Sequence, residues 1–156
     1  MLLRTRLRTP GRDRAAVAYA RMGESGGLWI ALAIAGAAVD SRRRGRWLAA
    51  AGTVPLALGL NYLVKRAVGR ERPRIAGLDP VGRVPVSRSF PSAHAATSFA
   101  GALRIAALVP GARAPLFAAA ALMALTRPYL GVHYPGDVAA GAAFGLTVGA
   151  VAEAAS

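Results

Sequence analysis

The chain has 156 residues, of which 54% are hydrophobic, and it contains no cysteine. This length suits a single domain, and the missing cysteine excludes a disulfide scaffold, a thiolate metal site and a cysteine nucleophile. The formal net charge of +13 comes almost entirely from arginine and favours an anionic partner: nucleic acid, an anionic lipid surface or a phosphorylated substrate. Nucleic acid is disfavoured, because the charges lie between apolar runs and do not follow one soluble face.

Residues 1–25 are expected to form a basic N-terminal arm. Its first part carries Arg4, Arg6, Arg8, Arg12 and Arg14. Residues 15–21 could form a short amphipathic helix that lies at a membrane surface. A frayed, solvated arm is the alternative.

Five apolar runs follow, at residues 26–39, 47–64, 93–109, 114–125 and 138–152. They show almost no polar face, which a soluble helical bundle would need. We therefore predict an all-α, integral-membrane bundle of five to six helices within residues 26–156. Several runs are shorter than the roughly 20 residues that usually cross a bilayer, so a hydropathy scan would miss some of them.

Two features inside the runs carry separate expectations. Gly141, Gly145 and Gly149 are spaced by four and would form a smooth stripe on a helix. Packing within the bundle is the favoured use of this stripe, and a homo-oligomer contact is the alternative. Arg104 lies six residues before Pro110, and we expect its side chain to reach the nearer membrane interface.

The polar residues at the borders of the runs converge on one side of the membrane. Successive spanning helices alternate in direction, so the end of the second run, the start of the third, the end of the fourth and the start of the fifth share a side. The residues found there are Lys65, Arg72, Ser92, Ala93, His94, Arg127, His133 and Asp137.

These residue types suit phosphate chemistry without a metal or cofactor. Lys65, Arg72 and Arg127 are fixed cations, and an arginine offers paired donors to a phosphate. Backbone N–H groups at Ser92, Ala93 and His94 would form an anion site at a helix start. His133 can act as a nucleophile if Asp137, four residues on, fixes its tautomer. His94 can then protonate the departing oxygen.

Three stretches resemble the signature motifs of the type 2 phosphatidic acid phosphatase (PAP2) superfamily. They are Lys65-x6-Arg72-Pro73, Pro91-Ser92-Ala93-His94 and Thr126-Arg127-x5-His133-x3-Asp137. The resemblance implies a PAP2/haloperoxidase-like helical core and a metal-independent phosphatase. It implies that His133 forms a phosphohistidine beside Asp137 and that His94 is the general acid. It also implies that Lys65, Arg72, Ser92 and Arg127 bind phosphate.

Two positions depart from the family pattern. Ala93 stands where glycine is usual, and a positive φ there would strain the site. Thr126 replaces the usual serine and keeps the hydroxyl. The small size and continuous apolar runs argue against the soluble haloperoxidase branch of the superfamily.

The substrate is expected to be a lipid phosphate. The loop at residues 74–90 mixes apolar side chains with arginines and is the candidate for reading it: Ile75, Leu78, Val81, Val84, Val86 and Phe90 with Arg74, Arg83 and Arg88. The arginine- and alanine-rich composition is typical of a high-GC bacterium. The resemblance then implies a polyprenyl-linked sugar phosphate such as decaprenylphosphoryl-5-phosphoribose. Phosphatidic acid, phosphatidylglycerol phosphate and a polyprenyl pyrophosphate stay open.

The distribution of positive charge favours a cytoplasmic site in the cell membrane. Excluding Lys65, Arg72 and Arg127, the side of the site remains more basic than the opposite side, which holds a compact cluster at residues 42–46.

Two other classes of function remain. One is a catalytically weak membrane protein that binds anionic lipid, and the other is a basic membrane-anchored adaptor in which the motifs are coincidental.

Overall fold

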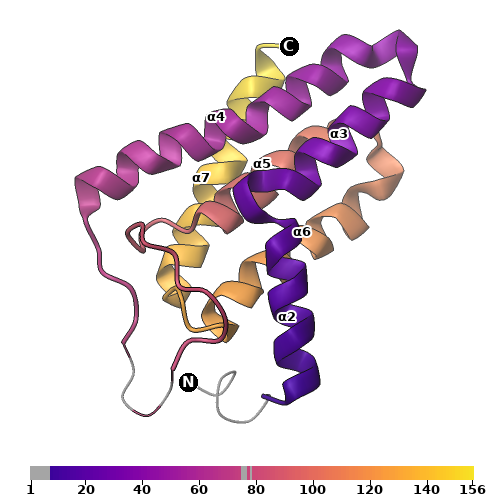
Figure 1. Cartoon of the computed structure of the whole chain (residues 1–156). Coiled ribbons are helices and arrows are strands. Elements are labelled where there is room, and N and C mark those ends of the chain that lie inside the picture. Colours follow the sequence, from indigo (N-terminus) through magenta and orange to yellow (C-terminus); the bar gives the residue numbers. More distant parts are fainter. Residues whose placement is uncertain (1–7, 75–76, 78) are drawn as a thin grey trace.

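A computed structural model describes residues 8–74, 77 and 79–156, and this part of the chain is helical and contains no strand. Within these described residues, six α-helices and three short 3-10 helices follow one another (Figure 1). They are α2 Pro10–Met22, η1 Glu24–Gly26, α3 Gly27–Val39, η2 Ser41–Arg43, α4 Arg44–Val68, α5 Ala93–Leu108, η3 Pro110–Ala112, α6 Arg113–Tyr129 and α7 Pro135–Ala154. The all-α fold class is confirmed, and each expected apolar run is a helix.

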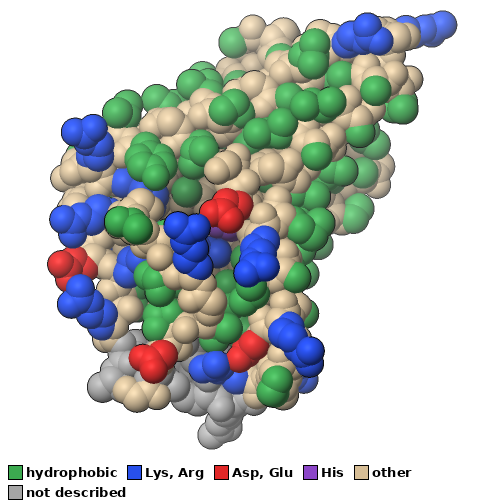
Figure 2. All heavy atoms as spheres, viewed as in Figure 1, with side chains coloured by type: hydrophobic (Ala, Val, Ile, Leu, Met, Phe, Trp, Pro, Cys, Tyr) green, Lys and Arg blue, Asp and Glu red, His purple; other side chains and the backbone are tan. Residues whose placement is uncertain are grey.

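The apolar helices are those of a membrane protein. By length and composition, residues 41–68 and α7 can each cross a bilayer, and α2 with residues 24–39 would be a third span bent by 45°. The 16 residues of α5 and 17 of α6 extend only about 24–26 Å, shorter than the hydrocarbon core of roughly 30 Å. Hydrophobic side chains cover the helical body, and many charged side chains gather at the loop end (Figure 2).

Helix α5 is the centre of the bundle and packs against α3, α4, α6 and α7. The glycine stripe of α7 lies against α5, and a Cβ at Gly145 would sit 2.1 Å from the carbonyl oxygen of Ala96. Gly141 and Gly149 are buried in the same contact. The favoured interpretation, packing within the bundle, therefore holds. The stripe leaves no free surface for a second copy of the chain.

Arg104 is buried in an ion pair near the C-terminal end of α7, and its expected reach to the membrane interface stays a prediction. This side chain is 1% exposed and pairs with Glu153 of α7, while its Nη2 donates to the Ser156 hydroxyl over 2.8 Å. Arg46 joins the same carboxylate over 2.7 Å. The carboxylate of Glu153 supplies the counter-charge that this buried guanidinium needs.

Helix α2 is ordered, so the frayed-arm alternative is wrong for its described part. Thr9 caps the helix, Pro10 occupies its first position, and the Tyr19 hydroxyl donates to the Ala119 carbonyl of α6 over 2.9 Å. Arg4 and Arg6 lie outside the described residues, as do Ile75 and Leu78. The boundary at residue 25 and the surface position of α2 remain predictions.

Candidate active site

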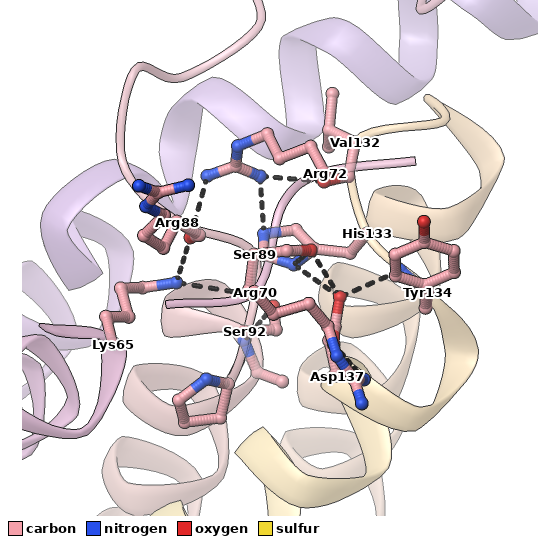
Figure 3. A network of polar contacts seen from close by, with 12 residues as sticks. Lys65, Arg70, Arg72, Arg88, Ser89, Ser92, Val132, His133, Tyr134 and Asp137 are labelled. Carbon is pink, nitrogen blue, oxygen red and sulfur yellow. Dashed lines mark hydrogen bonds and ion pairs between the residues drawn. The ribbon is translucent and has the colours of Figure 1, made fainter. Parts of the chain in front are cut away.

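The residues of the three motifs lie at one end of the bundle, as the alternation of helix direction predicts. Lys65 is in the last turn of α4, His94 is in the first turn of α5, and Arg127 is in the last turn of α6. His133 precedes α7, and Asp137 lies in its first turn. Figure 3 shows His133 between Arg72 on one side and Asp137 on the other.

His133 and Asp137 form a buried pair. The Nδ1 atom of His133 lies 3.4 Å from Asp137 Oδ2, and the two side chains are 3% and 0% exposed. The other ring nitrogen, Nε2, lies 3.0 Å from Nη1 of Arg72. A guanidinium can only donate, so Nε2 must accept and the proton of the neutral ring must sit on Nδ1. This is the tautomer in which Nε2 carries the lone pair.

Burial lowers the pKa of His133 to about 4, and nearby Arg72, Arg127 and Lys65 lower it further, against the opposing effect of the hydrogen bond to Asp137. The imidazole is therefore neutral at neutral pH, as a nitrogen nucleophile must be. Burial also lowers the pKa of Arg72, which lies in the loop after α4.

Asp137 is held by two residues that the motif analysis missed. The Ser89 hydroxyl donates to Oδ2, and Nη1 of Arg70 donates to Oδ1 over 3.0 Å. The backbone N–H of Tyr134 also donates to Oδ2, over 2.9 Å. Ser89 further lies 3.4 Å from His133 Nδ1. The carboxylate thus has partners on both oxygens, which fixes the orientation in which Oδ2 accepts the hydrogen bond from the imidazole Nδ1–H.

Lys65 and Arg72 hold the loop before α5. Lys65 Nζ donates to the carbonyl oxygens of Arg88 and Ser89 over 2.8 and 3.3 Å. Arg72 Nε donates to the carbonyls of Pro85 and Ser87, and its Nη2 donates to the Ser87 hydroxyl. Both cations lie at the expected end of the bundle. Most of the oxygens that accept their hydrogen bonds belong to the loop at residues 85–89.

Arg127 differs from these two cations. It is 5% exposed, its Nε is buried without a partner, and its guanidinium makes no hydrogen bond or ion pair with any described residue. It lines a cavity of about 540 Å³ together with His94. A buried cation without a partner is costly, so this guanidinium is prepared to receive an anion from the cavity.

His94 faces the same cavity and is anchored to α2. Its Nε2 lies 3.0 Å from the carbonyl oxygen of Ala20, and only a protonated Nε2 can make that hydrogen bond. The nitrogen that remains for proton transfer is therefore Nδ1. Arg127 of the third motif lines this cavity with His94, and Arg72 of the first motif lies 3.0 Å from His133 of the third, so contacts join the three motifs.

The start of α5 departs from the expected anion site in one respect. The N–H of Ser92 is not free, because it donates to the backbone carbonyl of Asp137 over 2.9 Å, and its hydroxyl caps Ala95. Ala93 does not lie in the left-handed region, where Ser25 is the one non-glycine residue among those described. Alanine in place of glycine is thus unstrained. The Thr126 hydroxyl donates to the Met123 carbonyl over 2.6 Å.

No group of three or more His, Cys, Asp or Glu side chains within residues 8–74, 77 and 79–156 is arranged to hold a metal ion. Metal independence stays a prediction. Around His133, the charged side chains labelled in Figure 3 are the cations Lys65, Arg70, Arg72 and Arg88 with one carboxylate, Asp137, and the cations are a donor set for an anion.

The PAP2 superfamily model matches residues 46–154. A decaprenylphosphoryl-5-phosphoribose phosphatase of Mycobacterium tuberculosis is 40% identical over 144 residues, which cover 92% of this chain and 80% of the relative. The structure of LpxE from Aquifex aeolicus aligns with a TM-score of 0.79 at 25% identity, over 98% of this chain and 91% of that one. A transmembrane PAP2-type phosphatidylglycerolphosphate phosphatase from Bacillus subtilis aligns with a TM-score of 0.77 at 23% identity, over 94% and 77%. The resemblance drawn from the three motifs is confirmed, and the chain belongs to the PAP2 superfamily.

Proposed function

We propose that this membrane phosphatase hydrolyses a phosphomonoester of a membrane lipid through a phosphohistidine at His133. The observation that carries the proposal is the setting of His133, whose Nδ1 faces Asp137 at 3.4 Å and whose Nε2 faces Arg72 at 3.0 Å. The lone pair that would attack phosphorus is thus directed toward the cations that would bind the phosphate.

Phosphate binding starts at Arg127, the buried cation without a partner. Lys65 and Arg72 lie on the opposite side of His133 from Asp137 (Figure 3). A phosphate oxygen can take over the Nη1–H that Arg72 directs at Nε2 in the free protein. That exchange frees the Nε2 lone pair and places phosphorus next to it.

The first chemical step forms the Nε2–P bond and breaks the bond from phosphorus to the lipid oxygen. His94 enters this step as the imidazolium, with a proton on each ring nitrogen, and it gives the Nδ1 proton to that oxygen, so the lipid leaves as an alcohol. The phosphoimidazole of His133 keeps its Nδ1 proton, directed at Asp137, and the carboxylate balances the positive charge that develops on the ring. In the second step, a water molecule attacks phosphorus while His94 takes a proton from it. Inorganic phosphate leaves and His133 is restored.

The substrate we propose is a polyprenyl-linked sugar phosphate such as decaprenylphosphoryl-5-phosphoribose. The support is the name of the Mycobacterium tuberculosis relative, at 40% identity over 92% of this chain. We place the site on the cytoplasmic side of the cell membrane, because the end of the bundle that holds it carries more of the basic residues.

Phosphate release from a panel of lipid phosphates by the purified protein in detergent tests this proposal. The panel contains decaprenylphosphoryl-5-phosphoribose, phosphatidylglycerol phosphate and phosphatidic acid. Turnover of at least one lipid that is lost in His133→Ala would support it. A protein that releases phosphate from none of them, while it still binds anionic vesicles, would instead be a lipid-binding protein.

A further inference from the structure

The cavity that holds Arg127 and His94 also has an acidic side chain on its wall. Glu24 lies in the turn between α2 and α3 and is the one carboxylate among the described residues that line the cavity. Arg21 and Arg83 also line the cavity. Figure 2 shows an acidic side chain between two basic ones, with a histidine visible behind them.

Glu24 is set at this place by a tightly packed turn. An added Cβ at Gly23 would sit 2.5 Å from Met123 Sδ, and one at Gly26 would sit 2.2 Å from Val54 Cγ1. Ser25 adopts φ 53°, a conformation that non-glycine residues use sparingly. Gly26 has a φ of 77° as well as this close contact, so the turn favours glycine there, and its packing fixes the backbone from which Glu24 extends at the cavity.

This carboxylate is unexpected in a site that must receive a phosphate dianion, because like charges repel. Glu24 forms no hydrogen bond or ion pair with any described residue, and it is exposed. It acts on Arg127 only at a distance. Its oxygens are thus available to a ligand in the cavity. An ionised carboxylate can only accept hydrogen bonds, so that ligand must donate.

A hydroxyl donor suits this cavity better than an ammonium donor, because Arg21, Arg83 and Arg127 line it and would repel a further cation. The volume of about 540 Å³ is within the roughly 300–1,000 Å³ of pockets that hold a whole small molecule. It therefore has room for more than a phosphoryl group.

We propose that Glu24 is a specificity residue that accepts hydrogen bonds from hydroxyl groups of the substrate headgroup, and that the substrate class is a lipid whose phosphate is carried on a polyol or sugar. The inference rests on the proposed phosphatase function. It predicts that the enzyme distinguishes such lipids from those in which the phosphate joins the lipid directly.

The test compares two lipids in the same detergent micelles, phosphatidylglycerol phosphate with a free headgroup hydroxyl and phosphatidic acid without one. Wild-type protein should show the higher kcat/KM on phosphatidylglycerol phosphate. Glu24→Gln and Glu24→Ala should lower that value about tenfold or more, the loss expected for a hydrogen bond to a charged group. The kcat/KM on phosphatidic acid should stay unchanged or rise, because a repulsive charge is removed.

Glu71→Gln is the matched control. Glu71 is an exposed glutamate that does not line this cavity, so the ratio between the two lipids should stay that of wild type. An equal fall on both lipids in the Glu24 variants, or no fall on either, would overturn the inference. Wild-type protein that releases phosphate from neither lipid, nor from decaprenylphosphoryl-5-phosphoribose in the same micelles, would instead refute the phosphatase function and this inference with it.

Discussion

Replacing His94 with alanine should slow the hydrolysis of a lipid phosphate far more than that of an aryl phosphate. In the structure, Nε2 of His94 is fixed by the Ala20 carbonyl at 3.0 Å, which leaves Nδ1 facing a cavity that also holds Arg127. A lipid alkoxide is a poor leaving group and needs the Nδ1 proton, whereas a phenolate needs little protonation. General acid catalysis contributes about 10²–10⁴-fold. We expect a loss in that range for the lipid and a markedly smaller one for the aryl phosphate.

The assay measures kcat/KM by phosphate release from phosphatidylglycerol phosphate and by absorbance from p-nitrophenyl phosphate. Loss of His94 also removes a hydrogen bond to α2, so Tyr19→Phe serves as the control. This variant removes a different hydrogen bond of α2, the one to the Ala119 carbonyl, and Tyr19 does not line the cavity that holds His94 and Arg127. Both substrates should respond alike to it. Equal damage to both substrates by His94→Ala would refute the acid role and leave His94 as a binding or structural residue.

Three further predictions follow from single contacts. Glu153→Ala leaves Arg104 buried without a counter-charge and should lower the free energy of unfolding by about 3–5 kcal/mol; Arg46→Ala, which removes the exposed partner, should cost about 0–1 kcal/mol. Equal shifts in thermal unfolding for the two variants would contradict this. Because burial lowers the pKa of His133 to about 4, its ring should be neutral at pH 6 and gain a proton only as the pH falls through about 4; a ¹⁵N NMR titration centred near 6.5 would contradict this. Activity should survive EDTA and be inhibited by vanadate, which resembles a five-coordinate phosphoryl group; loss in EDTA that Mg²⁺ restores would count against the mechanism.

The sequence predicted the helices and the end of the bundle that holds the site, because both follow from the apolar pattern. The run at residues 26–39 became α3 with nearly the same bounds. The run at residues 138–152 corresponds to α7, which is longer and spans Pro135–Ala154. The helix begins at Pro135, inside the third motif, because proline is favoured at the first position of a helix. Alternation of helix direction then brought the three motifs together.

Contacts between distant residues could not be predicted in this way. Ser89 and Arg70 reach Asp137 from 48 and 67 residues away in the chain, and no periodicity links such positions. The only signal in the sequence was that both residues lie close to a motif residue. Ser89 is three residues before Ser92, and Arg70 is two residues before Arg72. The ion pair between Arg104 and Glu153 was missed for the same reason.

The sequence also could not predict which of the three cations has hydrogen-bond partners within the protein and which has none. Lys65, Arg72 and Arg127 look alike as border residues, yet loop carbonyls satisfy the first two and leave Arg127 without a partner. That difference depends on how the chain at residues 85–89 folds back over α4. The prediction that the Ser92 N–H is free was wrong for the same reason. That N–H donates a hydrogen bond to the backbone carbonyl of Asp137, which lies far away in the sequence.

The most direct test of the central claim is a rapid-quench experiment with ³²P-labelled lipid phosphate. A phosphohistidine is labile in acid and stable in base, unlike the phosphate esters of serine or threonine. We predict a base-stable, acid-labile label on the wild-type protein within one turnover, located by proteolysis to the peptide that contains His133. His133→Ala should carry no label. Label that persists in His133→Ala, or turnover without any labelled protein, would contradict the assignment of His133 as the nucleophile.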